Sequence, residues 1–79
     1  MKIAETIDFW NKKRVGTKMW YANPSGGSIS QVLIVDVRYA DDEATIYANC
    51  DENKKIDINN LFVSKMEASA KQESYNKSL

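Results

Sequence analysis

The first fourteen residues have the hydrophobic spacing of a helix with one apolar face. Ile3, Ile7 and Trp10 stand at positions i, i+4 and i+7, and polar residues occupy most of the other positions. Acidic residues come early and basic residues late, an order that the helix dipole favours. We therefore expect an N-terminal amphipathic helix from about residue 2 to residue 13.

From Thr17 onward, β-branched and aromatic residues predominate and turn residues interrupt them at short intervals. This pattern predicts five strands, at residues 17–23, 29–39, 44–50, 55–58 and 62–64. The longest strand is expected to bend near Asp36, where the apolar positions change parity. We expect a mainly β fold closed into a small five-stranded barrel, because closure removes exposed strand edges.

The last fourteen residues contain helix formers but no continuous apolar stripe. Such a segment forms either a short fraying helix or a flexible tail. The expected organisation is an N-terminal helix at residues 1–14, a barrel at 15–65 and a C-terminal helix or flexible tail at 66–79.

The spacing of apolar residues and turns over residues 15–64 resembles the SH3-like barrel superfamily, most closely its Tudor-type members. The resemblance implies that a glycine opens the first strand and that alternate apolar positions of the later strands face the interior. The residues that match this pattern are Gly16, Val32, Ile34, Val37, Ala44, Ile46, Asn53, Ile56 and Leu61.

The aromatic cage of Tudor domains is not retained in this chain. Such a cage binds a methylated cation because the faces of several aromatic rings attract it together. Where the resemblance implies cage residues, the chain carries Ile29, Ser30, Ala48, Cys50 and Asp51. The resemblance therefore predicts the fold but not the binding of a methylated ligand.

Composition narrows the classes of partner. The chain has 79 residues, 43% hydrophobic and 28% charged, and its formal net charge is zero. Zero net charge argues against a general affinity for nucleic acid or anionic lipid, since both rest on many neutralised phosphates. Charges are nevertheless separated along the chain, because the charged residues are mostly basic in residues 1–30 and mostly acidic in residues 31–57. Such separation can steer a charged partner.

The sequence predicts a cytoplasmic protein. Cys50 stands alone and cannot form an internal disulfide, and Glu5 and Asp8 interrupt any signal-peptide apolar run. No apolar run approaches the roughly 20 residues that a membrane span requires. We therefore expect no membrane partner.

Neither catalysis nor a cofactor is expected. Histidine is absent, and a single cysteine cannot build a zinc site, so we expect no metal. The acidic segment 51–62 fails as a calcium loop, because Ile56 replaces the required glycine and Phe62 the bidentate glutamate. Cys50 is not expected to act as a catalytic nucleophile either, since neighbouring carboxylates raise the pKa of its thiol.

The leading hypothesis is a non-enzymatic protein-binding module. If Met19 and Tyr21 face the interior, alternation turns Trp20 outward, and inward Ala44, Ile46 and Ala48 would likewise turn Tyr47 outward. The N-terminal helix could cover these two aromatics, or they could bind a partner beside an acidic rim. The predicted partner-binding residues are Trp20, Tyr47, Asp41, Asp42, Glu43, Asp51 and Glu52. Self-association into a homo-oligomer, through this patch or an edge strand, is a variant of the hypothesis.

The alternative hypothesis is a nucleic-acid-binding module of the same fold. It would use basic side chains on phosphates and aromatic rings for stacking, at Lys12, Lys13, Arg14, Lys18 and Trp20 or Tyr21. A third possibility is a small inhibitor or modulator protein from a mobile element, for which no individual residue provides a signature.

Overall fold

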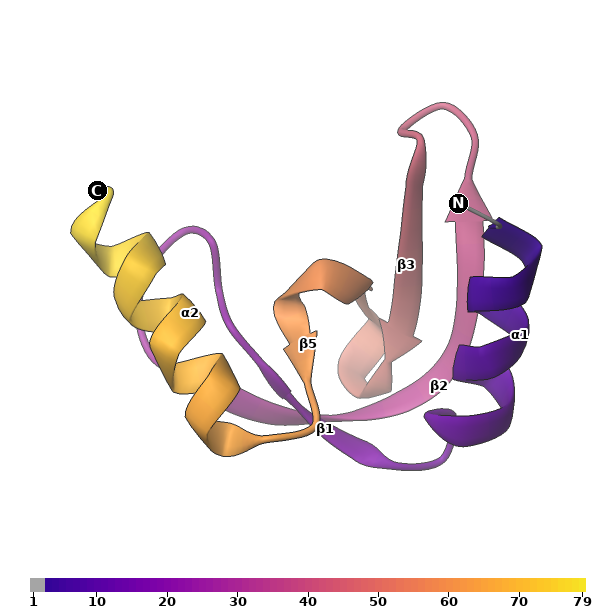
Figure 1. Ribbon diagram of the computed structural model, residues 1–79, viewed down its shortest axis with the longest axis horizontal. Helices are drawn as coiled ribbons and strands as arrows, with labels where there is room; N and C mark the ends of the chain where they lie inside the picture. Colours follow the sequence, from indigo (N-terminus) through magenta and orange to yellow (C-terminus); the bar gives the residue numbers. More distant parts are fainter. Residues whose placement is uncertain (1–2) are drawn as a thin grey trace.

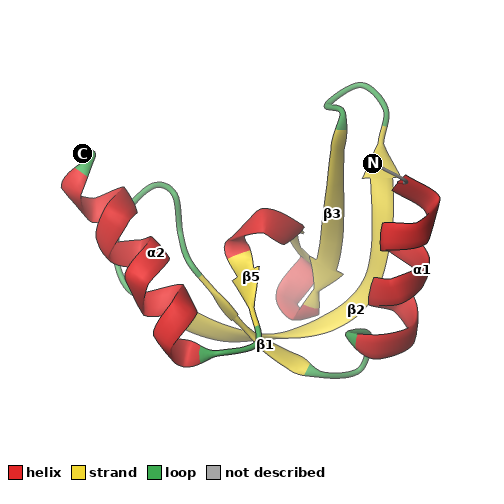
Figure 2. Cartoon of the chain, viewed as in Figure 1, coloured by secondary structure: helices red, strands yellow, loops and turns green. Residues whose placement is uncertain are grey.

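The computed structural model describes residues 3–79, in which two α-helices flank a bent antiparallel sheet (Figures 1 and 2). The α-helices are α1 (Ile3–Lys13) and α2 (Lys65–Lys77). The strands are β1 (Lys18–Tyr21), β2 (Ser30–Ala40), β3 (Thr45–Cys50), β4 (Lys54–Asp57) and β5 (Leu61–Phe62). Two single-turn 3₁₀ helices, η1 (Asp51–Asn53) and η2 (Ile58–Asn60), connect the last three strands.

The five strands lie in the order β4-β3-β2-β1-β5, and every neighbouring pair is antiparallel. β2 belongs to both halves of the sheet: its first residues pair with β1 and its later residues with β3. The register shifts between Ile34 and Asp36, where an extra residue bends the strand. The predicted bend near Asp36 is thus confirmed, and Figure 1 shows β2 as one long curved strand.

The sheet is not closed into a barrel. β4 and β5 stand at opposite ends of the strand order and, within residues 3–79, do not pair with each other. β5 is two residues long, and the chain between β4 and β5 is taken up by η2, where Asp57 accepts a hydrogen bond from the backbone of Asn59. The fold is therefore mainly β, but the prediction of a closed barrel is not supported.

The core lies on one face of the sheet. Its buried members are Met19, Val32, Ile34, Val37, Ile46, Ala48, Cys50, Ile56 and Leu61. These include most of the interior positions that alternation predicts, and Tyr21, also predicted to face inward, is half-buried and packs against the cluster. Ala44 is exposed in the turn between β2 and β3, where its φ of 52° removes it from the strand.

Helix α1 covers the core and leaves both outward aromatics of the sheet uncovered. Ile3, Ile7 and Trp10 pack against the core cluster, as the predicted stripe requires. The Asn11 amide donates to the backbone oxygens of Ile7 and Val37, at 2.9 and 3.4 Å, and joins α1 to β2. The helix begins at Ile3 in the described residues, so residue 2 of the predicted helix lies outside them.

Helix α2 is held by amide side chains rather than by an apolar stripe. Ser64 caps its first turn, accepting from the backbone nitrogens of Met66 and Glu67. The buried Gln72 side chain accepts from the backbone nitrogen of Asn23 at 2.7 Å and donates to its carbonyl oxygen at 2.9 Å. Two amide atoms thus satisfy both backbone groups of one loop residue, a contact that hydrophobic periodicity does not reveal.

Candidate functional site: the outer face of the sheet

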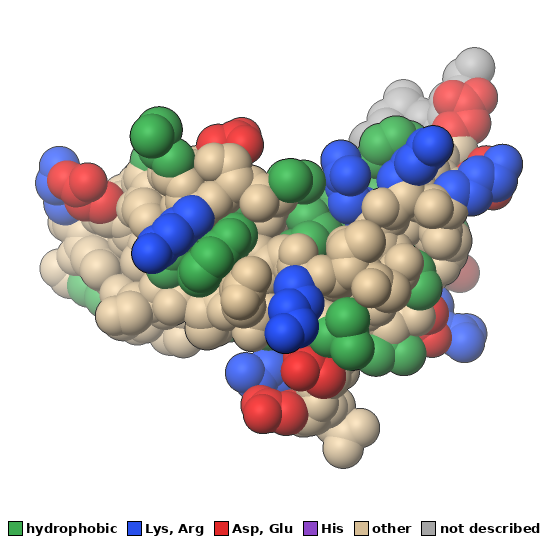
Figure 3. Space-filling view, turned by 90° about the horizontal axis from the view of Figure 1, so that it is seen from below, with side chains coloured by type: hydrophobic (Ala, Val, Ile, Leu, Met, Phe, Trp, Pro, Cys, Tyr) green, Lys and Arg blue, Asp and Glu red, His purple; other side chains and the backbone are tan. Residues whose placement is uncertain are grey.

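The convex face of the first half of the sheet carries a group of apolar side chains. Trp20 on β1 stands opposite Phe62 on β5 and diagonal to Leu33 on β2. Val35 follows at the bend and is 52% exposed, while Leu33 is 36% exposed. We call Trp20, Leu33, Val35 and Phe62 the apolar face. Figure 3 shows the molecule from below the view of Figure 1, with separate groups of hydrophobic side chains lying among basic and acidic ones.

Trp20 is half-buried because two neighbours flank it. Phe62 is its partner across the β1–β5 pair, and the Lys65 ammonium lies 5.4 Å from the centre of its ring. That distance permits a cation–π interaction. Val63, two positions before this lysine, and Met66, directly after it, are among the most exposed large hydrophobic residues, at 62% and 81%.

Acidic residues border the apolar face at the end of β3. The Asp51 carboxylate accepts a hydrogen bond of 3.0 Å from the backbone nitrogen of Leu33, which fixes η1 beside β2. Glu52 is exposed with a left-handed φ of 63°, and its carboxylate lies 3.5 Å from the Lys54 ammonium. These two acidic residues of the predicted rim therefore lie near the predicted aromatic Trp20, separated from it by β2.

Tyr47 lies in the other half of the sheet, away from Trp20. Its cross-strand neighbour on β2 is Arg38, whereas that of Trp20 is Gln31. Residues 31 and 38 are roughly 20 Å apart along an extended strand. The sequence predicted a single site containing both aromatics, and the structure places them in separate surroundings.

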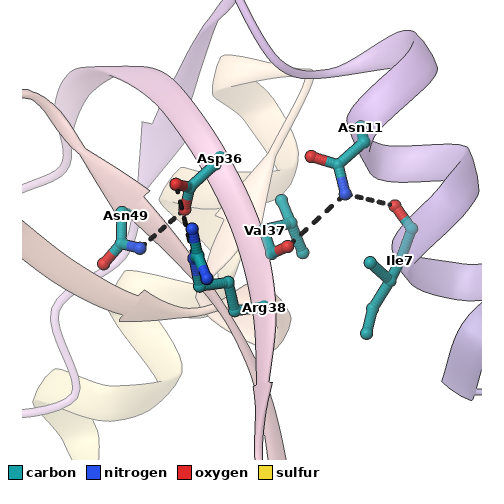
Figure 4. Close-up of polar contacts among 6 residues, drawn as sticks. All are labelled: Ile7, Asn11, Asp36, Val37, Arg38 and Asn49. Atoms are coloured by element: carbon teal, nitrogen blue, oxygen red, sulfur yellow. Dashed lines mark hydrogen bonds and ion pairs between the residues drawn. The ribbon is translucent and has the colours of Figure 1, made fainter.

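The surroundings of Tyr47 are polar and neutralised internally. The Lys55 ammonium lies 4.4 Å from the centre of the Tyr47 ring and 3.2 Å from the Glu43 carboxylate. In Figure 4, Asp36 accepts from Asn49 at 2.6 Å and pairs with Arg38 at 3.5 Å, on the side of β2 away from α1. We call the outward side chains of β2, β3 and β4 in this half the polar face; they are Asp36, Arg38, Tyr47, Asn49, Lys55 and Asp57.

The acidic turn at the tip of the β2–β3 hairpin is a third location. Asp41 and Asp42 are exposed there, and Glu43 belongs to the Lys55 ion pair of the polar face. The predicted acidic rim is therefore divided between the hairpin tip and η1, which lie at opposite ends of β3.

Of the basic residues of the alternative hypothesis, Lys18 lies on the same face as the stacking candidate Trp20, whereas Lys12 and Arg14 have partners within α1 and its C-terminal turn. Lys12 pairs with Asp8 at 3.1 Å, and the Arg14 guanidinium lies over Phe9 at 5.2 Å. Lys13 and Lys18 are exposed, Lys18 lying opposite Leu33 on the convex face. Tyr21 packs against the core cluster, so its ring is turned away from these lysines.

A cavity of about 170 Å³ opens between α1 and the far end of the sheet. Ile3, Tyr39, Ile46 and Ile58 give it an apolar wall, and Thr6, Ala44, Thr45, Asp57 and Asn59 complete the lining. Among residues 3–79, no cluster of three or more His, Cys, Asp or Glu could hold a metal ion. In that same stretch, neither helix combines the length and apolar character needed to cross a membrane.

Cys50 is buried at the end of β3, and the pKa of its thiol is raised to about 11, chiefly by burial. The negative charge of neighbouring Asp51 contributes to the increase, while Lys54 opposes it. The thiol is therefore protonated at neutral pH, when a nucleophilic cysteine needs to be a thiolate. The predicted direction is confirmed, although desolvation outweighs the like charge that the sequence suggested.

Leu33, Val35 and Phe62 are surface residues that the sequence analysis did not single out. The signal was present, since inward Val32 and Ile34 turn Leu33 outward by strict alternation. To predict that Val35 faces outward, the bulge has to be located one residue before Asp36. The parity of the apolar positions alone does not locate it there.

Comparisons of this chain with protein-family models, with curated proteins and with solved structures all give no match. The function has to be inferred from the geometry of its surface.

Proposed function

We propose that this chain is a non-enzymatic protein-binding module whose apolar face docks a partner protein. The observation that carries the proposal is the exposure of Leu33 and Val35 beside half-buried Trp20 and Phe62 on one convex surface. Aromatic and aliphatic side chains grouped in this way are typical of the centres of protein interfaces.

Charge at the edges supports a partner of mixed charge rather than a polyanion. Lys18 and Lys65 border the apolar face on the side of β1 and α2, whereas Asp51 and Glu52 border it beyond β2. A partner with complementary acidic and basic groups around an apolar centre would match this arrangement, and rim charges of this kind set orientation and association rate.

Nucleic-acid binding has less support. Two of its four basic side chains are engaged with Asp8 and Phe9, and Tyr21 packs inward. A salt titration with oligonucleotides is the direct comparison, because phosphate contacts weaken steeply as salt increases.

We also propose that the strands follow an SH3-like arrangement in an open form. The order β4-β3-β2-β1-β5, with a bent β2 shared between two half-sheets, supports this assignment. Fold similarity of this kind carries no function by itself.

A crosslinking pull-down from the native cell tests the proposed function. The Val35→Asp variant should lose the captured partner at least tenfold, because a carboxylate would be buried unpaired in the interface. The matched control is Phe9→Asp, which places the same charge at another exposed apolar residue, 47% exposed on α1. Equal capture by the wild type and the Val35→Asp variant would contradict the proposal.

A further inference from the structure

The sheet has free edges that differ in how they are protected. The outer edge of β4 carries Lys54 and Lys55, and edge lysines oppose pairing with another strand. β5 is two residues long and contacts α2. The first half of β2 is different, because β3 ends opposite Ile34 and leaves the preceding residues unpaired on that side.

The backbone groups that face this open edge follow from the hydrogen bonds of their neighbours. The backbone of Ile34 exchanges bonds with Gly16 and Thr17, at 2.8 and 3.0 Å, so it faces β1. The Leu33 nitrogen donates to Asp51, away from β1. Since successive residues of a strand alternate in direction, Gln31 directs its N–H and C=O groups to the open edge, and a pair that extends β2 by one residue would align those of Ile29 with them.

Side chains cap the chain on both sides of this stretch. The Asn76 amide binds both the nitrogen and the oxygen of Gly27, each at 3.0 Å, while Asp51 binds the Leu33 nitrogen. Residues 28–32 between the caps include exposed Ser28, Ser30 and Gln31. The segment from residue 25 to residue 35, SGGSISQVLIV, contains no charged side chain.

We infer that a second copy of this chain pairs antiparallel with this edge about a two-fold axis at Ser30. Ile29 and Gln31 of each copy then exchange N–H and C=O bonds with Gln31 and Ile29 of the other. A second copy fits because antiparallel pairing sets identical edges against each other: the paired residues 29–31 carry no charged side chain, whereas the β4 edge would bring lysines together.

The pairing has a consequence for the proposed function but does not depend on it. A two-fold axis perpendicular to the sheet at the paired strands places the same face of both sheets on one side. The apolar faces of the two copies would therefore adjoin and offer a partner two equivalent contact areas.

Sedimentation velocity of the full chain over a wide concentration range tests the inference. The wild type should shift from one chain to two as concentration increases. Ser30→Lys and Ser30→Glu should each weaken association at least tenfold, because like charges would meet at the axis. An equimolar mixture of the two variants should associate again. Ser69→Lys and Ser69→Glu, at an exposed serine of α2, are the matched controls and should behave as the wild type.

Amide hydrogen exchange on the unmodified chain provides a readout without substitutions. The amides of Ile29 and Gln31 should exchange more slowly as concentration rises, while that of Leu33, already bonded to Asp51, should not change. A single-chain mass at every concentration would overturn the inference. A dimer whose association is unaffected by charge at Ser30 but is lost in Val35→Asp would also overturn it, because the contact would then lie on the apolar face. Loss of partner capture in a Val35→Asp dimer leaves the inference intact.

Discussion

The two halves of one sheet present opposite kinds of outer surface. On the polar face, the Lys55 ammonium pairs with the Glu43 carboxylate and contacts the ring of Tyr47. Asp36 accepts a hydrogen bond from Asn49 and pairs with Arg38. On the apolar face, Leu33 and Val35 remain exposed beside Trp20. A surface whose charges are already paired has little to gain from a partner, whereas exposed apolar area gains about 25 cal/mol per Å² when it is buried. The comparison favours the first half of the sheet as the proposed docking surface.

The largest expected effect concerns the residue at which the halves join. Ile34 is 1% exposed, and Ile34→Ala should lower the free energy of unfolding by about 2–5 kcal/mol through lost burial and a cavity. The neighbouring Val35→Ala should change it by less than about 0.5 kcal/mol, because Val35 faces solvent. Urea unfolding of both variants checks the pair. Equal destabilisation would show that Val35 is structural and does not belong to a docking surface.

The second prediction tests whether α2 supports the apolar half alone. Gln72→Ala should cost about 1–3 kcal/mol, because both backbone groups of Asn23 lose their partner. Hydrogen exchange should accelerate in residues 22–29 and in α2, and remain unchanged in β3 and β4. Ser69→Ala, at an exposed position of the same helix, is the control. Uniform acceleration through all strands would mean that the two halves unfold as one unit.

The third prediction uses Cys50, which lies at the end of β3 where the halves meet. Its thiol has a folded pKa of about 11 against an ordinary 9.0, so folding favours the protonated form. The resulting stability is fully present below pH 9 and is lost as pH rises towards 11, by roughly 1–3 kcal/mol. Urea unfolding at several alkaline pH values should show a shallower decline in Cys50→Ala. Identical pH profiles would mean that the thiol is not desolvated.

The smallest effect is expected on the polar face. Lys55→Gln removes an exposed ion pair with Glu43 and a cation–π contact with Tyr47, which together are worth no more than about 1 kcal/mol. A double-mutant cycle with Glu43→Gln, measured at low and high salt, isolates the ion pair. A coupling free energy well above about 1 kcal/mol would mean that the side chains of the polar face form a rigid network.

The two helices show how far the sequence predicts this fold. The apolar spacing of Ile3, Ile7 and Trp10 predicted α1 and its buried side, because hydrophobic burial leaves a period of 3.6 residues. No such period exists in α2, whose attachment depends on Gln72 and Asn76 meeting the backbone of a loop some fifty positions earlier. Hydrogen bonds between specific atoms leave no periodic trace, so the sequence left a helix and a flexible tail open.

The candidate site divides in the same way. Alternation predicted that Trp20 and Tyr47 face outward, and the register of the strands agrees. Whether they share a surface depended on the bend of β2 at residues 34–36, a long-range property that sets the two halves apart. The sequence pattern also did not predict whether the barrel closes. Closure depends on η2 and the short β5, whose conformation is set by Asp57 and its neighbours.

A photo-crosslinking amino acid placed at position 35 or at position 47 tests the central claim most directly. Both positions face outward from the core, one in the apolar face and one in the polar face. Irradiation in the native cell should give a discrete adduct with a second protein from position 35, and only background from position 47. Equal adducts from both positions, or none from position 35, would contradict the assignment of the apolar face as the docking surface.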